Sequence, residues 1–501
     1  MGDQLTIDEM ATFCRKKGFV YANSDIYGGN SGFFDYGPLG VELFNNLKQH
    51  WWQFLIRRND MVGIDGALIS NPNVWKASGH VDHFGDLILT CTKCKQDFRA
   101  DHFIEDALKV PGDGLSAKAV NALVQKHKLT CTKCKGPFTE VKDFNLMFQT
   151  SLGASKEKAE TAYLRGELAQ NIFMNFKIIT ETARMKLPFG IGSIGSVFRN
   201  EIAPRDFLFR CRQFHIAEFE YFIHPEQQEC PLLTRELLKI PFTFLAAEAQ
   251  QKDRHEEQAT VSDLMAKGKC DAWQAYWITQ QFAWFRALGI SDTHLRLREH
   301  LKTELSHYSS GTFDIEYRFP FGTKEVAGNA NRGQFDLTNH QNASGKSQEF
   351  FDEETKQKVI PRVIEPTWGM GRVFLMVLNE AYHDDQERGN IVLKLHPSLA
   401  PYAVGVFPLV NKLDEKASEI HHLLRMHLPA FYDRSGSIGR RYARADEIGI
   451  PYCITVDFDT LNDQAVTIRD RDSTKQKRAP IAKLADTIKR LINSETAFAT
   501  L

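Results

Sequence analysis

Two strand-like segments joined by an arginine-rich loop constrain the fold of this chain more than any other feature. The first segment closes at Glu201 and the second opens at Phe214. Alternate residues of a strand share one face, so the charged side chains of each segment point the same way. These side chains, with one aromatic ring among them, are Arg199, Glu201, Arg212, Phe214 and Glu218. Burying four charged groups on otherwise apolar strands is costly unless something polar fills the space between them.

A ligand with three kinds of chemistry would satisfy this pattern. A flat ring would pack on Phe214, a phosphate would pair with the arginines, and an ammonium would pair with Glu218. The alternative is an internal ion-pair network, which is the commoner reason for charged residues on a strand. The hairpin therefore predicts either a charged, planar ligand or a set of internal ion pairs.

The length and charge of the chain limit its class. At 501 residues the chain exceeds one hydrophobic core, so about two to four domains are expected. With 43% hydrophobic and 25% charged residues, the composition is that of a soluble globular protein. The formal net charge of −1 does not by itself point to a nucleic-acid partner, so any RNA contact must come from local basic patches.

Hydropathy and cysteine usage limit the location. The segment Met1–Phe19 is polar and mixed in charge, unlike a signal peptide. Because no run of about 18 apolar residues occurs, we expect no membrane span. Nine cysteines in 501 residues are too few for a disulfide scaffold. These features favour a cytoplasmic protein with reduced thiols.

A second charged motif spans residues 364–372, directly before an apolar run. Pro366 is expected to end a strand, and the glycines that follow allow a tight turn, which places Arg372 in the first turn of a helix. A helix N-terminus attracts anions, and an arginine there strengthens a phosphate site. The alternative is a helix-start arginine on the surface. Glu365, if buried in this motif, needs a partner in either case.

Paired cysteines form a third motif. The heptapeptide Leu-Thr-Cys-Thr-Lys-Cys-Lys begins at Leu89 and recurs unchanged at Leu129. Two Cys-x-x-Cys knuckles in a reduced protein predict a tetrahedral zinc site that is structural and closed, because all four sulfurs are used. The predicted ligands are Cys91, Cys94, Cys131 and Cys134. The alternative is a degenerate insertion that keeps reduced thiols.

The hairpin and the 364–372 motif together resemble the second and third motifs of class II aminoacyl-tRNA synthetases. More narrowly, the chain resembles the single-chain, homodimeric glycyl-tRNA synthetases of bacterial type. Further segments that match this family, spread over essentially the whole chain, are residues 34–40, 98–102, 144–148, 314–322, 439–442 and 446–449.

The resemblance implies an α/β fold. A catalytic α+β domain would be built on an antiparallel sheet, and a C-terminal α/β domain would bind the anticodon. Family members are homodimers, and the helix expected at residues 39–56 is the implied interface element. The implied segments are 1–79 (catalytic domain, N-terminal part), 80–150 (insertion with the cysteine knuckles), 151–225 (catalytic core with the hairpin), 226–310 (helical insertion), 311–396 (catalytic core with the second motif) and 397–501 (anticodon-binding domain).

The resemblance also implies how ATP is held. In such enzymes the equivalent of Arg199 holds the α-phosphate, and that of Arg372 takes the γ-phosphate. Glu325 is the implied ligand of Mg²⁺, and Phe214 stacks on the adenine, with Glu201 beside it. The implied ATP-binding residues are Arg199, Asn200, Glu201, Phe209, Arg210, Cys211, Arg212, Gln213, Phe214, Glu325, Val326, Gly369, Met370, Gly371 and Arg372.

Glycine recognition follows in the same way. Three glutamates and a threonine would surround the ammonium, and Arg99 would reach the substrate from the insertion. Since glycine has no side chain, selectivity would come from a pocket that leaves no room at the α-carbon. The implied glycine-binding residues are Arg99, Glu167, Phe214, His215, Ile216, Ala217, Glu218, Glu365, Pro366, Thr367, Trp368 and Gly369.

The densest basic cluster of the C-terminal segment is Arg440, Arg441 and Arg444. Beside Tyr442, these arginines could grip tRNA through phosphate contacts and base stacking. The alternative is a solvated charged face.

The implied activity is ATP-dependent attachment of glycine to tRNA(Gly) through a glycyl-adenylate, with glycine, ATP and tRNA(Gly) as partners. Two alternatives stay open. One is a class II synthetase of histidine, proline or threonine specificity, although the three-glutamate pocket favours glycine over these amino acids. The other is a non-catalytic, nucleic-acid-binding relative, but such proteins lose the phosphate arginines, and this chain has both Arg199 and Arg372.

Overall fold

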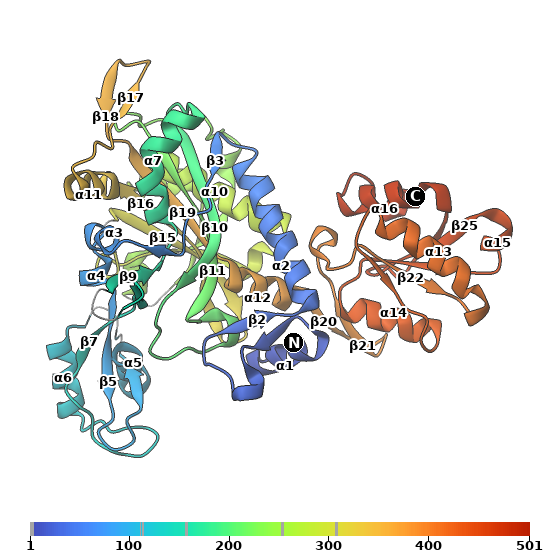
Figure 1. Cartoon of the computed structure of the whole chain (residues 1–501), viewed down its shortest axis with the longest axis horizontal. Coiled ribbons are helices and arrows are strands. Elements are labelled where there is room, and N and C mark those ends of the chain that lie inside the picture. The colour runs from blue at the N-terminus through green and yellow to red at the C-terminus, as the bar shows by residue number, and fades with distance from the viewer. Residues whose placement is uncertain (1–4, 111, 113–114, 156–158, 252–254, 306–308) are drawn as a thin grey trace.

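A nine-stranded sheet forms the centre of the main body in the computed structural model (Figure 1), which describes residues 5–110, 112, 115–155, 159–251, 255–305 and 309–501. The strand order is β13-β12-β14-β15-β16-β19-β11-β10-β3. The strands are β3 (Met61–Gly63), β10 (Phe189–Phe198), β11 (Gln213–Ile223), β12 (Phe242–Leu245), β13 (Glu257–Ala259), β14 (Leu295–Glu299), β15 (Gly311–Phe319), β16 (Gly322–Gly333) and β19 (Arg362–Gly369).

Antiparallel pairing dominates this sheet. The pairs from β14 to β10 and the pair β12–β13 are antiparallel, whereas β12–β14 and β3–β10 are parallel. The predicted fold class, an α/β protein with an antiparallel central sheet, is confirmed. Smaller sheets comprise β1 (Val20–Ala22) with β2 (Phe34–Tyr36), β4 (Ile69–Ser70) with β8 (Gln149–Leu152) and β9 (Glu160–Leu164), and β17 (Phe350–Asp352) with β18 (Gln357–Val359).

Helices pack on this sheet and beside it. They are α1 (Ile7–Lys17), α2 (Pro38–Trp51), α3 (Pro72–Ala77), α4 (His80–His83), α7 (Ala169–Ala183), α8 (Ala247–Gln250), α9 (Val261–Ala266), α10 (Ala272–Ala287), α11 (Phe335–Ser344) and α12 (Met370–Ala381). None of the helices in the described part of the chain is both long and apolar enough to cross a membrane.

The helix expected at residues 39–56 is present as α2 and a π-helical turn, Trp52–Ile56. Pro38 occupies the first helical turn, where its missing N–H is tolerated. The apolar stripe of α2, including Leu43, Leu47 and Trp51, is buried in the core of this same chain. An interface on α2 would therefore use its other side.

The segment 226–310 is not the helical insertion that was predicted. Its strands β12, β13 and β14 extend one edge of the central sheet. Helix α10 packs on that sheet with Trp273, Trp277 and Trp284 fully buried. A helix that is apolar all round belongs in a core, so its composition does not by itself indicate a separate helical unit.

The cysteine-bearing segment has a small core of its own. A three-stranded sheet of β6 (Asp97–Arg99), β5 (Gly85–Thr90) and β7 (Lys142–Asn145) packs with α5 (Ala100–Leu108) and α6 (Ala117–Lys126) around Leu89, Phe103 and Val120. Figure 1 shows this unit projecting from the main body.

The C-terminal lobe is built on a mixed five-stranded sheet in the order β23-β22-β24-β25-β26 (Figure 1). Its hydrophobic core is separate from that of the main body. The elements are β22 (Val404–Pro408), α13 (Asp414–Arg425), β23 (Ala430–Tyr432), α14 (Ile438–Glu447), β24 (Tyr452–Val456), α15 (Thr460–Asp463), β25 (Ala465–Asp470), β26 (Gln476–Pro480) and α16 (Leu484–Ile492).

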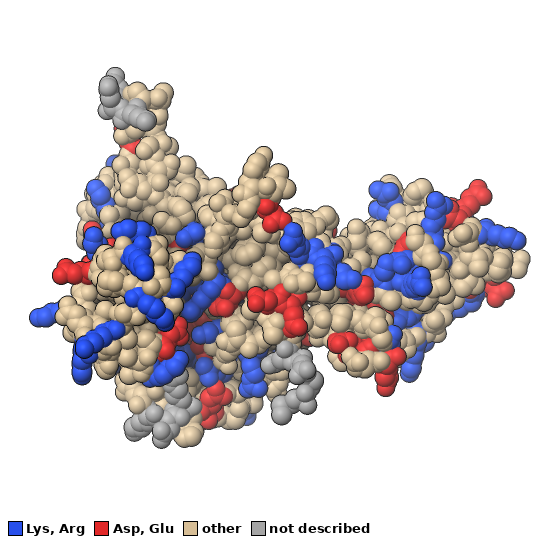
Figure 2. Space-filling model, turned by 90° about the horizontal axis from the view of Figure 1, so that it is seen from below, with Lys and Arg blue, Asp and Glu red and all other residues tan. Residues whose placement is uncertain are grey.

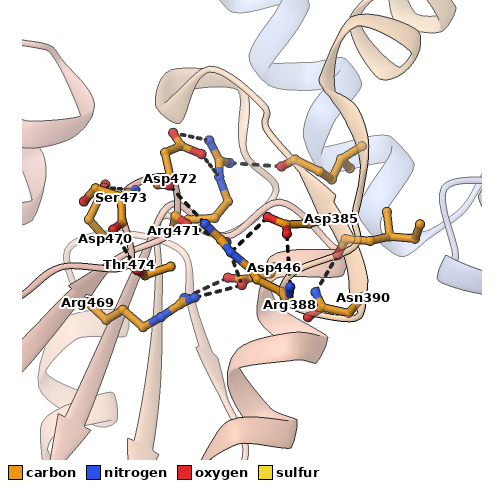
Figure 3. A network of polar contacts seen from close by, with 12 residues as sticks. Asp385, Arg388, Asn390, Asp446, Arg469, Asp470, Arg471, Asp472, Ser473 and Thr474 are labelled. Carbon is orange, nitrogen blue, oxygen red and sulfur yellow. Dashed lines mark hydrogen bonds and ion pairs between the residues drawn. The ribbon is translucent and has the colours of Figure 1, made fainter. Parts of the chain in front are cut away.

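A polar network joins this lobe to the main body (Figure 3). The hairpin β20 (Tyr382–Asp385) and β21 (Asn390–Leu393) follows α12 and carries Arg388 in its turn. Arg388 pairs with Asp446 of α14 at 3.3 Å, and Arg469 donates two hydrogen bonds to Asp446 at 2.8 and 2.9 Å. Buried Arg471 donates to the carbonyl oxygens of Leu393 and Leu395. The network therefore ties the lobe to the element that follows α12.

Replacing Asp446 is expected to destabilise the protein. Asp446→Ala leaves Arg469 buried without its carboxylate, and such a loss costs about 3–5 kcal/mol. The urea-unfolding midpoint of the intact chain measures the effect. Asp292→Ala is the matched control, because Asp292 and Arg286 form a more exposed pair worth about 1 kcal/mol or less. Equal losses in the two variants would contradict a structural role for the network.

Candidate active site

The charged hairpin, β10 and β11, lies between β19 and the edge strand β3 of the nine-stranded sheet. In the antiparallel pair β10–β11, Val197 is opposite Phe214 and Ser193 is opposite Glu218. The expectation that Arg199 and Glu201 lie on the first strand is wrong, because β10 ends at Phe198. Beyond that residue the chain turns, with the Glu201 N–H donating to the Arg199 carbonyl at 2.7 Å. The charges of the first segment therefore lie in the loop that joins the two strands of the hairpin.

A cavity of about 110 Å³ lies at this loop end of the hairpin. Residues from the hairpin, from β16 and from the start of α12 meet there, although they lie far apart in sequence. Its lining residues are Arg199, Glu201, Leu208, Phe209, Arg210, Cys211, Phe214, Ile216, Glu325, Thr367, Gly369, Gly371 and Arg372. Every one of these except Leu208 belongs to the predicted ATP or glycine set.

Two arginines approach the cavity from different elements. Arg372 lies in the first turn of α12, as predicted, with its guanidinium 4.4 Å from the Phe209 ring centroid. Its Nη1 lies 2.9 Å from a carboxylate oxygen of Glu325. Arg199 donates to the Gly166 carbonyl at 3.2 Å and lies 5.4 Å from the Phe214 ring centroid. With Arg210 and Glu201, which also line it, the cavity combines three cations, two carboxylates and two aromatic rings.

The ion-pair alternative holds for part of the hairpin. Arg210 donates to Glu201 at 2.7 Å, and Asp86 links Arg210 to Arg99. Within the described residues, however, Arg199 and Glu218 form no ion pair. Internal ion pairing therefore accounts for Glu201, whereas Arg199, Arg212 and Glu218 have no ion-pair partner among the described residues.

Several predicted contact residues lie outside the cavity lining. Arg99 is held by Asp86 and Asp101 of the same cysteine-bearing unit at 3.2 and 2.7 Å, and Asp86 also lies 3.8 Å from Arg210 of the hairpin loop. Arg212 donates to the Glu201 carbonyl, and the Asn200 N–H donates to the Leu146 carbonyl. His215 contacts Ser196 at 3.1 Å, and burial lowers its pKa to about 4.

Four predicted residues have their side chains in the hydrophobic core. They are Ala217, Val326, Trp368 and Met370. Ala217 and Trp368 are register partners in the pair β11–β19 and alternate with the residues that face the cavity. Such residues could meet a ligand through their backbone alone. Gln213 is exposed, and Pro366 is buried in β19.

The predicted glutamates gather deeper in the sheet. Glu167 lies 3.2 Å from His80 Nε2 and accepts a hydrogen bond from Gln170 at 2.8 Å. Burial alone would raise the pKa of Glu167, but His80 and Arg332 lower it. Glu365 pairs with Arg332 at 2.8 Å. Burial nevertheless raises the pKa of Glu365 to about 7.

Sequence reasoning missed Arg332 and Gln170, which hold two of the glutamates. It required a partner for Glu365 but could not locate one, since Arg332 comes from the neighbouring strand β16. It also missed Glu220, although alternation along β11 places Glu220 on the same face as Glu218. Both residues are almost completely buried, at 0% and 1% exposure.

A family model described as an anticodon binding domain matches residues 403–491. The glycine--tRNA ligase of Malacoplasma penetrans is 43% identical over 487 residues, 96% of each chain. That of Caldanaerobacter subterraneus subsp. tengcongensis is 42% identical over 487 residues, 95% of this chain and 96% of the relative. That of Geobacillus thermodenitrificans is 41% identical over 505 residues, 98% of each chain.

The chain belongs to the glycine--tRNA ligase family.

In this member of the glycine--tRNA ligase family, the two cysteine knuckles have the same backbone geometry. Lys95 and Lys135, at matching positions of the repeat, both adopt positive φ. The Sγ atoms of Cys91 and Cys134 are 3.5 Å apart, and those of Cys94 and Cys131 are 3.7 Å apart. All four sulfurs lie within 4.8 Å of one another. Zn–S bonds of about 2.3 Å in a tetrahedron need sulfurs about 3.8 Å apart, so the residues fit zinc.

The three arginines of the basic cluster in the C-terminal lobe differ in burial and in their partners. Arg441 is buried and donates to the carbonyls of Pro408 and Gly436, so the prediction that it contacts tRNA is wrong. Arg444 pairs with Asp433 at 2.5 Å, and Arg440 is exposed. Figure 2 shows Lys and Arg side chains over both the main body and the C-terminal lobe on one face. An RNA contact in this family member would therefore rest on local groups such as Arg440.

Proposed function

We propose that this protein attaches glycine to tRNA(Gly) in an ATP-dependent reaction of the class II synthetase type. The observation that carries the proposal is the meeting of Arg199, Arg372 and Phe214 in one cavity beside the buried Glu218. A nucleotide has a planar base and a charged phosphate chain, and an amino acid has an ammonium. Full-length similarity to glycine--tRNA ligases supports glycine as the amino acid.

The chemistry needs positioning and charge neutralisation rather than a general base. The glycine carboxylate attacks the α-phosphorus of ATP, the bond to the bridging oxygen breaks, and pyrophosphate leaves with that electron pair. Arg199 would stabilise charge at the α-phosphate, and Arg372 at the γ-phosphate. Glu325 is the candidate ligand for Mg²⁺, which when bound would neutralise phosphate charge. A hydroxyl of the 3′-terminal ribose of the tRNA then attacks the glycyl carbonyl carbon, the bond from that carbon to the phosphate oxygen breaks, and AMP leaves.

Glycine-dependent ATP–pyrophosphate exchange tests this proposal. The assay is run with each of the twenty amino acids, and exchange with glycine alone is expected. Exchange with histidine, proline or threonine instead would favour a synthetase of another specificity. Exchange with none of them would favour a non-catalytic, nucleic-acid-binding relative.

The remaining proposals concern assembly and location. We propose a homodimer, from the family resemblance, and a cytoplasmic location, from the sparse, unpaired cysteines. We also retain the domain limits expected from the sequence, except for the helical character of residues 226–310. Sedimentation equilibrium of the purified chain would give twice the monomer mass of 57.2 kDa if the dimer proposal holds.

A structural zinc ion held by the two knuckles is proposed as well. Protein purified without chelator is expected to contain about one zinc per chain by elemental analysis. Cys91→Ser should lower the zinc content and destabilise the unit around the knuckles, because zinc contributes directly to folding in such sites. Cys270→Ser is the control, since Cys270 lies outside the cluster. A zinc content near zero in the unmodified protein would refute the site.

A further inference from the structure

A buried glutamate behind Glu218 has no role in the proposed reaction. Glu220 lies two residues further along β11, and within the described residues neither of its carboxylate oxygens has a hydrogen-bond partner. Single oxygens of Glu218, Glu220 and Glu365 lie within 4.8 Å of one another. A buried, unpartnered carboxylate is among the most costly groups a fold can hold, so its presence needs a chemical reason.

The strand register surrounds Glu220 with acids. Glu218 pairs with Thr367 and Tyr221 pairs with Ile364, which places Glu220 opposite Glu365 across β11 and β19. On the other side its register partner is the apolar Ile191 of β10. The charged groups that act on Glu220 are Glu218, Glu365, Arg332 and Asp336.

Among the described residues, the arginines near this cluster, Arg332 and Arg165, are fewer than its carboxylates. Arg332 donates to Asp336 at 2.7 and 2.9 Å and to Glu365 at 2.8 Å, and it lies 3.6 Å from Glu167. The Arg332 guanidinium therefore already interacts with three carboxylates, and Glu218 and Glu220 add two more. Buried like charges this close cannot all be ionised, so the cluster must hold at least one proton.

Hydrogen bonding decides which carboxyl holds the proton. A hydrogen bond from the Leu168 backbone favours the ionised form of Glu218, and Arg332 favours the ionised form of Glu365. Glu220 accepts no hydrogen bond that the structure describes. Burial raises the pKa of Glu220 well above its ordinary value, and Glu365 and Glu218 raise it further.

We propose that Glu220 is a neutral carboxylic acid that acts as a positioning residue for glycine recognition. Its O–H donates a hydrogen bond to the Glu218 carboxylate, whose Oε1 otherwise has no partner in the described structure. This bond orients Glu218 and keeps its negative charge available for the ammonium of the substrate. The inference rests on the proposed function for the identity of that substrate.

Two variants of Glu220 test the proposal through the KM for glycine in pyrophosphate exchange. Glu220→Gln keeps a neutral donor of the same shape, so we expect a KM within about threefold of the wild-type value. Glu220→Leu keeps the volume but removes the donor, and we expect the KM to rise about tenfold or more, since a hydrogen bond to a charged group is lost. The KM for ATP should not change in either variant.

Three results would overturn the proposal. A loss in Glu220→Gln as large as that in Glu218→Gln would show that Glu220 acts as an anion. A wild-type KM in Glu220→Leu would show that Glu220 only fills space. The infrared difference spectrum between wild type and Glu220→Gln at neutral pH should contain the C=O stretch of a protonated carboxylic acid, and its absence would also refute the proposal.

The infrared measurement separates this inference from the proposed function. It needs no substrate and no enzymatic turnover. If glycine supports no exchange but the protonated carboxyl band is present, the proposed function fails and the protonation of Glu220 stands. If exchange with glycine is observed and the band is missing, the proposed function stands and the protonation of Glu220 is refuted.

Discussion

Arg199→Ala is expected to abolish glycine-dependent pyrophosphate exchange while the protein stays folded. Arg199 lines the cavity, forms no ion pair among the described residues, and donates its only assigned side-chain hydrogen bond to the Gly166 carbonyl. Its charge is therefore free to act on a phosphate. Removing one preorganised group that stabilises transition-state charge lowers a rate by about 10²–10³-fold, and an arginine on a transferring phosphoryl group can be worth more.

The thermal midpoint of Arg199→Ala should stay close to that of the wild type, because few native contacts depend on this side chain. Arg205→Ala is the matched control, since Arg205 lies in the same loop, is 46% exposed and pairs with the neighbouring Asp206. We expect near wild-type exchange in the control. A fully active Arg199→Ala enzyme would show that the hairpin does not hold the reacting phosphate.

Local patterns predicted the parts of the site that short segments of sequence define. The helix N-terminus at Arg372 follows from the glycines around it, and the knuckles follow from an exact repeat. The expectation that Pro366 ends a strand is wrong, because β19 continues through Pro366 to Gly369. The hairpin was predicted as a pair, although its strands end earlier than expected. These features depend on turn residues and on the alternation of side chains along a strand, and both can be read from a single sequence.

Features that depend on tertiary contacts were not predictable in this way. The partner of Glu365 is Arg332, because β16 pairs with β19. The hydrophobic pattern of a sequence does not show which strands pair. Arg441 was expected on the surface but is buried, since its guanidinium satisfies carbonyl oxygens at the end of β22 and the start of α14. Segment 226–310 was expected to be helical, but its strands are short and lie at the sheet edge.

Glu218→Gln is expected to reduce glycine use strongly while making the fold more stable. Glu218 is 1% exposed, forms no ion pair within the described structure, and its Oε1 has no hydrogen-bond partner there, so in the free protein its charge is a net cost. An ammonium would compensate this charge, and removing one partner of such a buried pair costs about 2–5 kcal/mol. The KM for glycine should therefore rise by about 30-fold to 4 × 10³-fold, with the KM for ATP unchanged. The free energy of unfolding should rise rather than fall.

The pH dependence of the glycine KM checks the same assignment. Burial raises the pKa of Glu218 well above its ordinary value, Glu365 and Glu167 raise it further, and Arg332 opposes them. As the pH falls through this raised pKa, Glu218 takes up a proton that the ammonium must displace, so the KM rises on the acid side. Glu218→Gln cannot bind that proton and should lose this part of the profile. An unchanged profile, or a variant that is both less stable and fully active, would show that Glu218 has a structural role instead.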